Sequence, residues 1–351
     1  MSRHHPERVL LLAMYPLDRG LWGATARITQ ISAALASLTR LEVVSGTRGR
    51  RAWSLARFVA GGRLRGLGGV YVENATTLPG PADLAFVACA RLFRVPVLTY
   101  VRDAQQLFPE YFRATGLKRR LSRALFLPLT RLLIRLSSRA TFPSPGLAMA
   151  VTGRSDEALL PPGARLAAAP PLDPAARTLL FVGGLRVPAH GGEILLEGTR
   201  LARERGHLVE LLCVTRPGEE PSEPMPPWAR VLHAEGEGID ELLPGVLASI
   251  TPRRRTPYND LAVPIKVMEY LGYGRPLIVT DATEQARIVR ESQCGVVVPD
   301  TAEGIADGIG QVVSANPDTL AAWGRAALAA AEANSWESRA RRVLELLGVA
   351  A

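Results

Sequence analysis

The stretch TPYNDLAVPIKVMEYLGYGRPLIVT, residues 256–280, decides the fold that this sequence predicts. It has the features of a loop, a helix and a buried strand in succession. Pro264 suits the first turn of the helix, where its missing N–H would have no partner. Gly272 and Gly274 with Pro276 end the helix, and the apolar run PLIVT predicts a short buried strand. The same alternation recurs along the chain and predicts a doubly wound parallel sheet.

Two charged residues interrupt the apolar side of this helix. Lys266 and Glu269 are three residues apart and therefore share a face. A lysine at a helix N-terminus is unfavourable unless an anion is bound there, held by free N–H groups and the ammonium together. Glu269 would then accept hydrogen bonds from the ribose of a nucleotide. The alternative is a surface ion pair. The chain has 40 arginines and two lysines, which favours a lysine required by its site.

The bulk properties are those of a folded protein with two domains. A length of 351 residues suffices for two cores, and 47% of the residues are hydrophobic. The cysteines Cys89, Cys213 and Cys294 have no metal-ligand spacing, and we expect reduced thiols in a cytoplasmic protein. No apolar run reaches the ~20 residues of a membrane span, and no signal peptide or metal site is expected.

Strands are expected in both halves of the chain, with helices between them. They are expected at residues 9–14, 41–46, 70–74, 96–103, 178–185 and 295–298. Residues 153–176 are rich in Pro, Ala and Gly and are the expected linker between the halves.

Charge divides the same two halves. Residues 1–170 have a net charge of +15 and residues 171–351 a net charge of −6, which together give the +9 of the chain. Basic runs at 47–66 and 111–155 are interpreted either as solvated helix faces or as a surface for anionic lipid. Pro128 is expected to kink or divide the helix within the second run. Nucleic acid is not an expected partner, because only 6% of residues are aromatic and no stacking motif is present.

Several motifs together resemble glycosyltransferase family 4. They are YPLDRGLWGATARITQISAAL near the start, RDAQQLFPE after the fourth strand, FVGGL, the pattern P-x-K-x-x-E-Y-L-x-x-G-R-P, the GVVV strand and a closing helix that begins SW. The resemblance extends over essentially the whole chain and is most specific at residues 252–300. It implies the α/β GT-B architecture, with two Rossmann-like domains of doubly wound parallel sheet that face a cleft.

The resemblance also implies a division of labour among three segments. Residues 1–170 would form the N-terminal acceptor-side domain, and residues 171–332 the C-terminal domain that binds a nucleotide-sugar. Residues 333–351 would form a helix that returns to the N-terminal domain. Members of the family typically retain the anomeric configuration and need no metal, and no Asp-x-Asp motif is present in this chain.

The motifs assign roles to individual residues. Lys266 is a catalytic candidate that would meet the donor diphosphate, and Glu269 matches the second glutamate of the family's paired motif. The first glutamate of the pair falls on Leu261, and the family's phosphate-clamp Arg and Lys fall on Gly184 and His190. The expected donor-binding residues are Gly23, Gly183, Gly184, Arg253, Asn259, Asp260, Lys266, Glu269 and Glu284.

Asp103 is the expected catalytic residue on the acceptor side. It follows the fourth strand and would orient or deprotonate a hydroxyl group, with Arg102 beside it meeting negative charge. The alternative is that Asp103 caps the short helix that follows.

We therefore expect a hexosyltransferase-type glycosyltransferase (EC 2.4). It would move sugar from a nucleotide diphosphate sugar to a glycan, lipid-linked or natural-product hydroxyl, with no cofactor, as in polysaccharide biosynthesis. It is expected in the cytoplasm or peripherally on the inner face of the cell membrane. The alternatives are a GT-B-fold nucleotide-sugar epimerase and a catalytically silent partner subunit.

Overall fold

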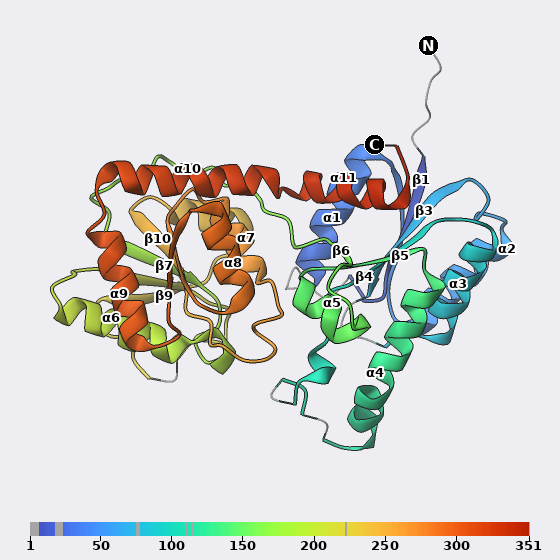
Figure 1. Cartoon of the computed structure of the whole chain (residues 1–351), viewed down its shortest axis with the longest axis horizontal. Coiled ribbons are helices and arrows are strands. Elements are labelled where there is room, and N and C mark those ends of the chain that lie inside the picture. The colour runs from blue at the N-terminus through green and yellow to red at the C-terminus, as the bar shows by residue number, and fades with distance from the viewer. Residues whose placement is uncertain are drawn as a thin grey trace, which may run out of the picture. The chain divides into compact units, whose positions relative to one another are not determined.

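The computed structural model describes residues 7–17, 24–74, 78–109, 111–113, 115–221 and 223–350. The chain divides into two compact units (Figure 1). Unit 1 consists of Met1–Gly163 with Trp336–Ala351, and unit 2 consists of Ala164–Ser335. The expected boundaries lay after residues 170 and 332. The first boundary lies seven residues earlier and the second three residues later. Both ends of unit 2 are held together there, because Ala164 pairs with Ser335 in a parallel bridge and donates its N–H to Asn334 O at 2.8 Å.

Unit 1 contains a parallel six-stranded sheet. Its strand order is β2-β1-β3-β4-β5-β6. The strands are β1 (Arg8–Ala13), β2 (Arg40–Val44), β3 (Leu67–Asn74), β4 (Val97–Val101), β5 (Arg139–Phe142) and β6 (Ala158–Leu159).

Helices cover both faces of this sheet because the strands are apolar on both sides. In β1, alternate residues enter two different cores. One core contains residues of α1 (Ala24–Leu38) and α11 (Trp336–Leu347), and the other contains residues of α2 (Arg48–Ala60), α3 (Pro81–Leu92) and α4 (Leu117–Leu136). The 3₁₀ helix η1 (Gln105–Leu107) and α5 (Pro145–Thr152) complete the unit.

Trp336, the first residue of α11, packs where the chain re-enters unit 1. A Cβ atom on Gly163 would lie 2.4 Å from Cδ2 of Trp336, so the indole occupies the space beside this glycine. The Trp336 ring also lies 5.6 Å from the guanidinium carbon of the fully buried Arg27, which stands 4.0 Å from the centre of the Tyr100 ring. The last helix is thereby fixed into unit 1 at its first residue.

Unit 2 contains a second parallel six-stranded sheet, of order β12-β11-β10-β7-β8-β9. The strands are β7 (Thr178–Val182), β8 (Glu210–Val214), β9 (Ala229–Leu232), β10 (Val246–Thr251), β11 (Leu277–Thr280) and β12 (Gly295–Val298). The helices are η2 (Pro188–His190), α6 (Gly192–Glu204), η3 (Gly236–Leu242), α7 (Ile265–Leu271), α8 (Thr283–Ser292), α9 (Ala302–Val313) and α10 (Pro317–Ala333).

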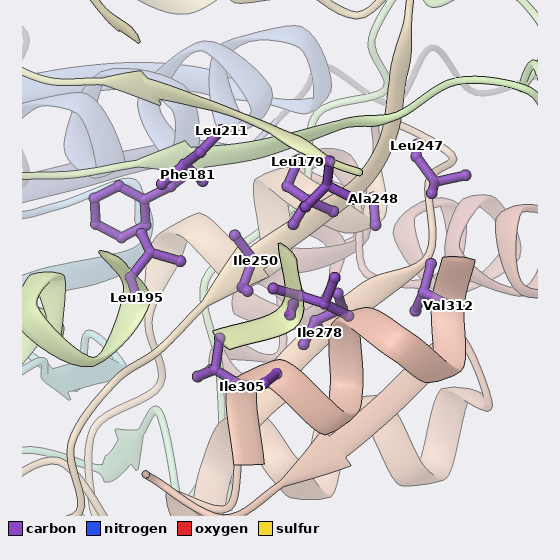
Figure 2. Packing of buried hydrophobic residues seen from close by; sticks show 14 of the residues in the cluster. Leu179, Phe181, Leu195, Leu211, Leu247, Ala248, Ile250, Ile278, Ile305 and Val312 are labelled. Carbon is purple, nitrogen blue, oxygen red and sulfur yellow. The ribbon is translucent and has the colours of Figure 1, made fainter. Parts of the chain in front are cut away.

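Two cores lie on the two faces of the unit 2 sheet. Figure 2 shows the first, in which Leu195 of α6 and Ile305 and Val312 of α9 pack on strand residues such as Phe181. The second core joins α7, α8 and α10 to the opposite face of the same strands. The strand order reverses direction between β7 and β10, because β8 follows β7 on one side and β11 follows β10 on the other. Ligands bind at such switch points in folds of this kind.

The predicted class, an α/β fold with two doubly wound parallel sheets, is confirmed. One local prediction is wrong, and one of the two alternatives for Pro128 is excluded. Pro264 is the N-cap of α7 rather than part of its first turn, with an extended backbone (φ −71°, ψ 126°). Pro128 does not divide the helix that contains it, since α4 runs unbroken from Leu117 to Leu136. Among the described residues, no helix is both long enough and apolar enough to cross a membrane.

Candidate functional site

The switch point of unit 2 brings together residues from β7, β10 and α7. Gly183 and Gly184 follow β7, and Arg253 follows β10. Helix α7 lies between these loops in the second core, where Val267, Met268, Tyr270 and Leu271 are buried. The apolar side of α7 therefore anchors the helix and directs Lys266 towards the end of β7.

The ammonium group of Lys266 lies against the end of β7. Its Nζ is 4.9 Å from the centre of the Phe181 ring. A Cβ atom built on Gly183 would stand only 2.5 Å from Nζ, and Gly183 has φ of +152°. Glycine is required at position 183 both for this backbone conformation and for the space that the ammonium occupies.

Burial and neighbouring charges weaken the protonated form of Lys266. Burial, followed by repulsion from Arg253, lowers the pKa of Lys266 to about 7, although Glu269 and Glu219 act in the opposite direction. Burial raises the pKa of Glu269, and this is opposed by Arg165 and Lys266. No ion pair between Lys266 and Glu269 is found among the described residues, so the surface ion pair considered from the sequence does not form.

His190 is neutral in this site. Burial and the positive charges of Lys266 and Arg253 lower its pKa to about 3. Its Nδ1 lies 3.2 Å from the carbonyl oxygen of Gly184, so the neutral ring donates a hydrogen bond from Nδ1. His190 thus supplies no positive charge to this site.

The backbone N–H groups of Gly183 and Gly184 differ in whether they are already hydrogen-bonded within the fold. Gly183 donates its N–H to Val214 O at 2.8 Å, which occupies it within the fold. The N–H of Gly184 has no acceptor within the described part of the chain. Of the two expected backbone donors, only Gly184 can therefore meet a phosphate without breaking an existing hydrogen bond.

Arg216 and Glu219, in the loop after β8, belong to the same site, although the sequence does not predict them as site residues. The two side chains approach to 3.8 Å, and a Cβ atom on Gly184 would lie 2.5 Å from Oε2 of Glu219. Both residues alter the pKa of Lys266, Arg216 lowering and Glu219 raising it. No motif marks them, but β8 is the neighbour of β7, so its following loop must reach the same edge.

Arg253 is held in place by Asn259. The Arg253 Nε donates to Oδ1 of Asn259 at 2.8 Å. The two amide hydrogens of Asn259 are directed to Ala189 O at 3.2 Å and Arg254 O at 2.7 Å, and the residue is buried. A sugar hydroxyl would have to displace one of these bonds to accept from the amide. The side chain orients the loops around the site.

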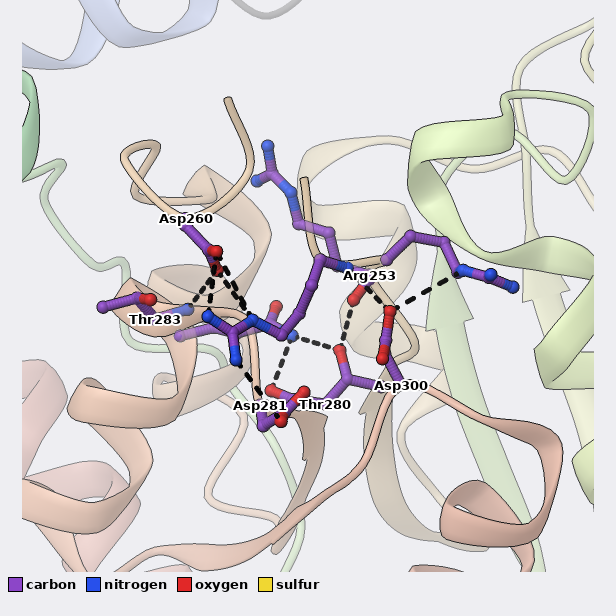
Figure 3. A network of polar contacts seen from close by, with 9 residues as sticks. Arg253, Asp260, Thr280, Asp281, Thr283 and Asp300 are labelled. Carbon is purple, nitrogen blue, oxygen red and sulfur yellow. Dashed lines mark hydrogen bonds and ion pairs between the residues drawn. The ribbon is translucent and has the colours of Figure 1, made fainter. Parts of the chain in front are cut away.

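Asp260 belongs to a polar network at the carboxyl ends of β10, β11 and β12 (Figure 3). Its Oδ1 accepts from Thr283 N at 3.0 Å, and Arg255 lies 3.0 Å from its Oδ2. Burial acts against it, but these hydrogen bonds hold the pKa of Asp260 below its usual value. Asp260 thus fixes the Arg255 loop to the start of α8.

Glu284 lies in the first turn of α8 and is buried. Its carboxylate pairs with Arg287 at 2.9 Å, one turn further along the same helix. Burial raises its pKa, and the Arg287 partner opposes this shift. The side chain is therefore engaged within its own helix.

The predicted acceptor-side residues lie in unit 1. Arg102 and Asp103 follow β4, and the Asp103 Oδ1 accepts from Ala104 N at 2.7 Å. The N-cap of η1 is Ala104, so the alternative that Asp103 caps this helix does not hold. Gly23 lies outside the described residues.

Comparison with known proteins gives one family match and several solved structures of similar fold. Residues 176–315 match the family described as Glycosyl transferases group 1. No curated protein sequence matches the chain significantly. Among solved structures, a glycosyltransferase from Rickettsia africae is 12% identical, with a TM-score of 0.67 over 97% of this chain and 98% of that one.

Two other structures are similar over comparable lengths. Sucrose-phosphate synthase from Thermosynechococcus elongatus is 13% identical, with a TM-score of 0.65, over 97% of this chain and 98% of that one. Alr3699/HepE of Anabaena, in complex with UDP and glucose, is 16% identical, with a TM-score of 0.65, over 97% and 99%. At such identities the likeness shows the fold, which is the two-domain GT-B fold. The family match adds support for a sugar-transferring glycosyltransferase, and it falls on the unit that contains Lys266.

Proposed function

We propose that this protein is a glycosyltransferase that moves a sugar from a nucleotide diphosphate sugar to an acceptor hydroxyl. The observation that carries the proposal is the Lys266 ammonium at the switch point of unit 2, against Gly183 and next to Gly184, whose N–H has no acceptor among the described residues. The family match over residues 176–315 supports it, as do the UDP complexes of the structurally similar Anabaena protein.

The proposed chemistry uses the charges of this site on the leaving group. The bond between the anomeric carbon and the diphosphate oxygen breaks, and negative charge builds on the diphosphate. Lys266, Arg253 and the N–H of Gly184 stabilise that charge, while Glu269 accepts hydrogen bonds from the ribose hydroxyls. No metal ion or further cofactor is needed in this scheme, because the side chains supply the positive charge.

The acceptor would be handled by unit 1. Asp103 orients the acceptor hydroxyl and takes up its proton as the new bond to the anomeric carbon forms. Arg102 meets negative charge on the acceptor or the leaving group. We propose retention of the anomeric configuration, as the resemblance implies. The excess of basic residues in residues 1–170 favours an acceptor presented at an anionic membrane surface.

Nucleotide binding by the purified protein tests the donor role. Thermal denaturation is recorded with UDP, GDP, ADP and dTDP, because ligand at about 100 times its Kd adds about 2.7 kcal/mol to the free energy of unfolding. The bound nucleotide is then used in calorimetry. Lys266→Ala should weaken binding and reduce transfer by about two or more orders of magnitude. Lys118→Ala changes the only other lysine, which is exposed and lies in unit 1, and should leave nucleotide affinity unchanged. Unaltered transfer by Lys266→Ala would remove Lys266 from the mechanism.

The ribose role of Glu269 has a separate test. The wild-type protein should bind a ribonucleoside diphosphate more tightly than its 2′,3′-dideoxy analogue, by about 10–100-fold for hydrogen bonds to a charged group. Glu269→Gln should reduce that ratio. Glu303→Gln, at a glutamate in the first turn of α9 that is not among the expected donor-binding residues, is the control. A ratio that Glu269→Gln leaves intact would refute the assignment. Tight nucleotide binding without turnover would favour the silent partner subunit, for which the uncharged positions 184 and 190 are the motive.

A further inference from the structure

Helix α4 has an exposed apolar stripe on the side away from its buried face. The buried residues are Phe126, Thr130 and Leu133. The stripe consists of four leucines at intervals of four, four and seven residues, which places them on one side of a helix. These are Leu117, Leu121, Leu125 and Leu132, with exposed fractions of 83%, 55%, 37% and 40%.

Every charged residue of α4 is basic and exposed. The six cations are Lys118, Arg119, Arg120, Arg123, Arg131 and Arg135. The sequence has no acidic residue from 111 to 155. None of the six forms an ion pair with a carboxylate in the described ranges of the chain. By contrast, Arg51 in the other basic run is buried and paired with Asp83 at 2.7 Å. Part of the run at 47–66 is therefore structural, whereas no cation of α4 is paired with a carboxylate among the described residues, although Arg119 and Arg131 donate to backbone carbonyl groups.

The first turns of α4 make few contacts with the rest of unit 1. Residues 115–121 are all exposed. Figure 1 shows the N-terminal end of α4 extending beyond the sheet of its own unit. A short stretch of helix gains little stability alone, and exposed leucines cost free energy in water. Packing within unit 1 accounts for the buried face of α4 but not for the exposed leucines of its first turns.

We propose that α4 lies on an anionic lipid bilayer, with its leucine stripe in the headgroup–acyl boundary and its cations at the lipid phosphates. A leucine stripe bordered by cations is the pattern of a helix that lies in a membrane interface. A nucleic acid would meet the cations but would leave the leucines exposed to water. The charge of α4 and the geometry of its stripe thus select an anionic bilayer.

Docking through α4 would also bring Arg102 and Asp103, the predicted acceptor-side residues, near the lipid surface. The 3₁₀ helix η1 begins two residues after Asp103 and packs against α4. A bilayer bound by α4 would hold the carboxyl end of β4 close to the lipid surface. The acceptor class that follows is a hydroxyl on a lipid-anchored molecule. This acceptor class rests on the proposed transferase function, whereas bilayer binding can be measured without a donor.

Vesicle sedimentation tests the proposal with the full chain. The probes are vesicles of phosphatidylcholine alone and vesicles containing 30 mol% phosphatidylglycerol (about a third of the lipid, to give an anionic surface). The wild-type protein should bind the anionic vesicles and be released by salt. Leu117→Ser with Leu121→Ser should weaken binding by more than about tenfold. Lys118→Gln with Arg120→Gln should weaken it by about fivefold for each charge.

The matched controls lie in unit 2. Leu208→Ser changes a leucine that is 69% exposed, and Arg230→Gln changes an exposed arginine. Both should bind vesicles like the wild type. Equal binding to the two kinds of vesicle, or wild-type binding by the α4 variants, would overturn the proposal. So would a duplex nucleic acid that binds α4 independently of the leucines.

Failure of docking and failure of the transferase function are distinguishable. The α4 variants should keep the nucleotide affinity of the wild type, because their substitutions lie in unit 1 and on the surface. Lys266→Ala should keep vesicle binding. Loss of vesicle binding in Lys266→Ala would show that α4 is not the surface that binds the bilayer.

Discussion

Gly183 and Lys266 depend on each other at the scale of single residues. Gly183→Ala would place a methyl group 2.5 Å from the lysine Nζ and force a backbone of φ +152° on a residue with a side chain. We expect a loss of about 1–3 kcal/mol in the free energy of unfolding, together with loss of nucleotide affinity, because Lys266 is displaced. Chemical denaturation and calorimetry measure the two effects.

Gly206→Ala is the control for backbone strain. Gly206 also has positive φ, +92°, but its Cβ position has no neighbour within 4 Å. This variant should lose stability, by about 1 kcal/mol, and keep nucleotide affinity. If Gly183→Ala behaved in the same way, the contact with Lys266 would not matter for binding.

The lowered pKa of Lys266 predicts how pH affects binding. The folded protein holds this proton with a pKa of about 7, whereas the unfolded chain holds it with a pKa near 10.5. Between these values the unfolded state binds more protons, so the contribution of Lys266 to stability rises with pH. A bound diphosphate favours the ammonium, and its affinity should therefore fall above pH 7, by up to about tenfold per pH unit.

Calorimetry in buffers of different ionisation enthalpy measures the linked proton. Proton uptake on nucleotide binding at pH 8 is the expected result. Lys266→Arg removes the titration in this range, so its affinity should not follow the same pH dependence. A wild-type affinity that is constant from pH 7 to 9 would contradict the assigned contact between ammonium and phosphate.

Residue type explains which site residues the sequence revealed. Lys266 stood out because lysine is rare in this arginine-rich chain, and Glu269 stood out by its spacing from Lys266. Arg216 and Glu219 did not, because arginine and glutamate are common and their loop has no motif. The sequence predicts Asn259 as a donor-binding residue, but it does not predict the hydrogen bond that its amide donates to Ala189 O, 70 residues away.

At the scale of elements, α7 is attached to β7 by a hydroxyl group. Val182 donates its backbone N–H to the Tyr270 Oη at 2.7 Å. Tyr270→Phe would leave this N–H without its acceptor and should reduce the free energy of unfolding by about 1–3 kcal/mol. The melting temperature should fall by about 2–4 °C for each kcal/mol. Nucleotide affinity should fall as well, because Gly183 follows Val182 directly.

Tyr273→Phe is the matched control for Tyr270→Phe. The ring of Tyr273 is buried in the same core and lies 5.7 Å from that of Tyr270. No hydrogen bond of its hydroxyl is found in the part of the chain that the structure describes. A calorimetric melting curve for Tyr273→Phe close to that of the wild type is expected. Equal destabilisation by the two substitutions would show that the hydrogen bond from Val182 N–H to Tyr270 does not contribute measurably to stability.

Most strands were predictable because both faces of each sheet are buried. Runs such as VLLLA in β1 and GVVV in β12 are apolar at successive positions and need no alternation to be found. The prolines were less predictable. Pro264 fits an extended N-cap as well as a first turn, and Pro128 lies in a helix whose buried face, with Phe126 and Leu133, holds it together. Tertiary packing decides both cases.

At the scale of the whole molecule, the core of unit 1 includes residues of the C-terminal helix, whereas the cores of unit 2 do not. The helix α11 supplies Ala340, Val343, Leu344, Leu346 and Leu347 to a core of unit 1. Unit 2 contains Lys266, Glu269 and Arg253, on which the proposed nucleotide binding depends, and both of its own cores. Removal of residues 336–351 should therefore unfold unit 1 and spare unit 2.

The fragment 164–335 tests this division. We expect it to fold, with a cooperative melting transition, and to bind nucleotide diphosphate. The shorter fragment 171–332, cut at the boundaries expected from sequence, lacks Arg165, whose two bonds to Asp240 span 2.6–2.7 Å, and lacks the pairing of Ala164 with Ser335. It should melt at a lower temperature. An unfolded 164–335 fragment would show that unit 2 depends on unit 1.

The pairing of Ala164 with Ser335 places the entry and the exit of unit 2 side by side. A module whose ends meet can be grafted into another chain, or replaced by a foreign one, without stretching the host on either side. The preference for a nucleotide-sugar donor would then be transferred together with this one segment. A chimera that keeps the first 163 residues and the closing helix but carries another module should change its nucleotide while it goes on serving its original acceptor.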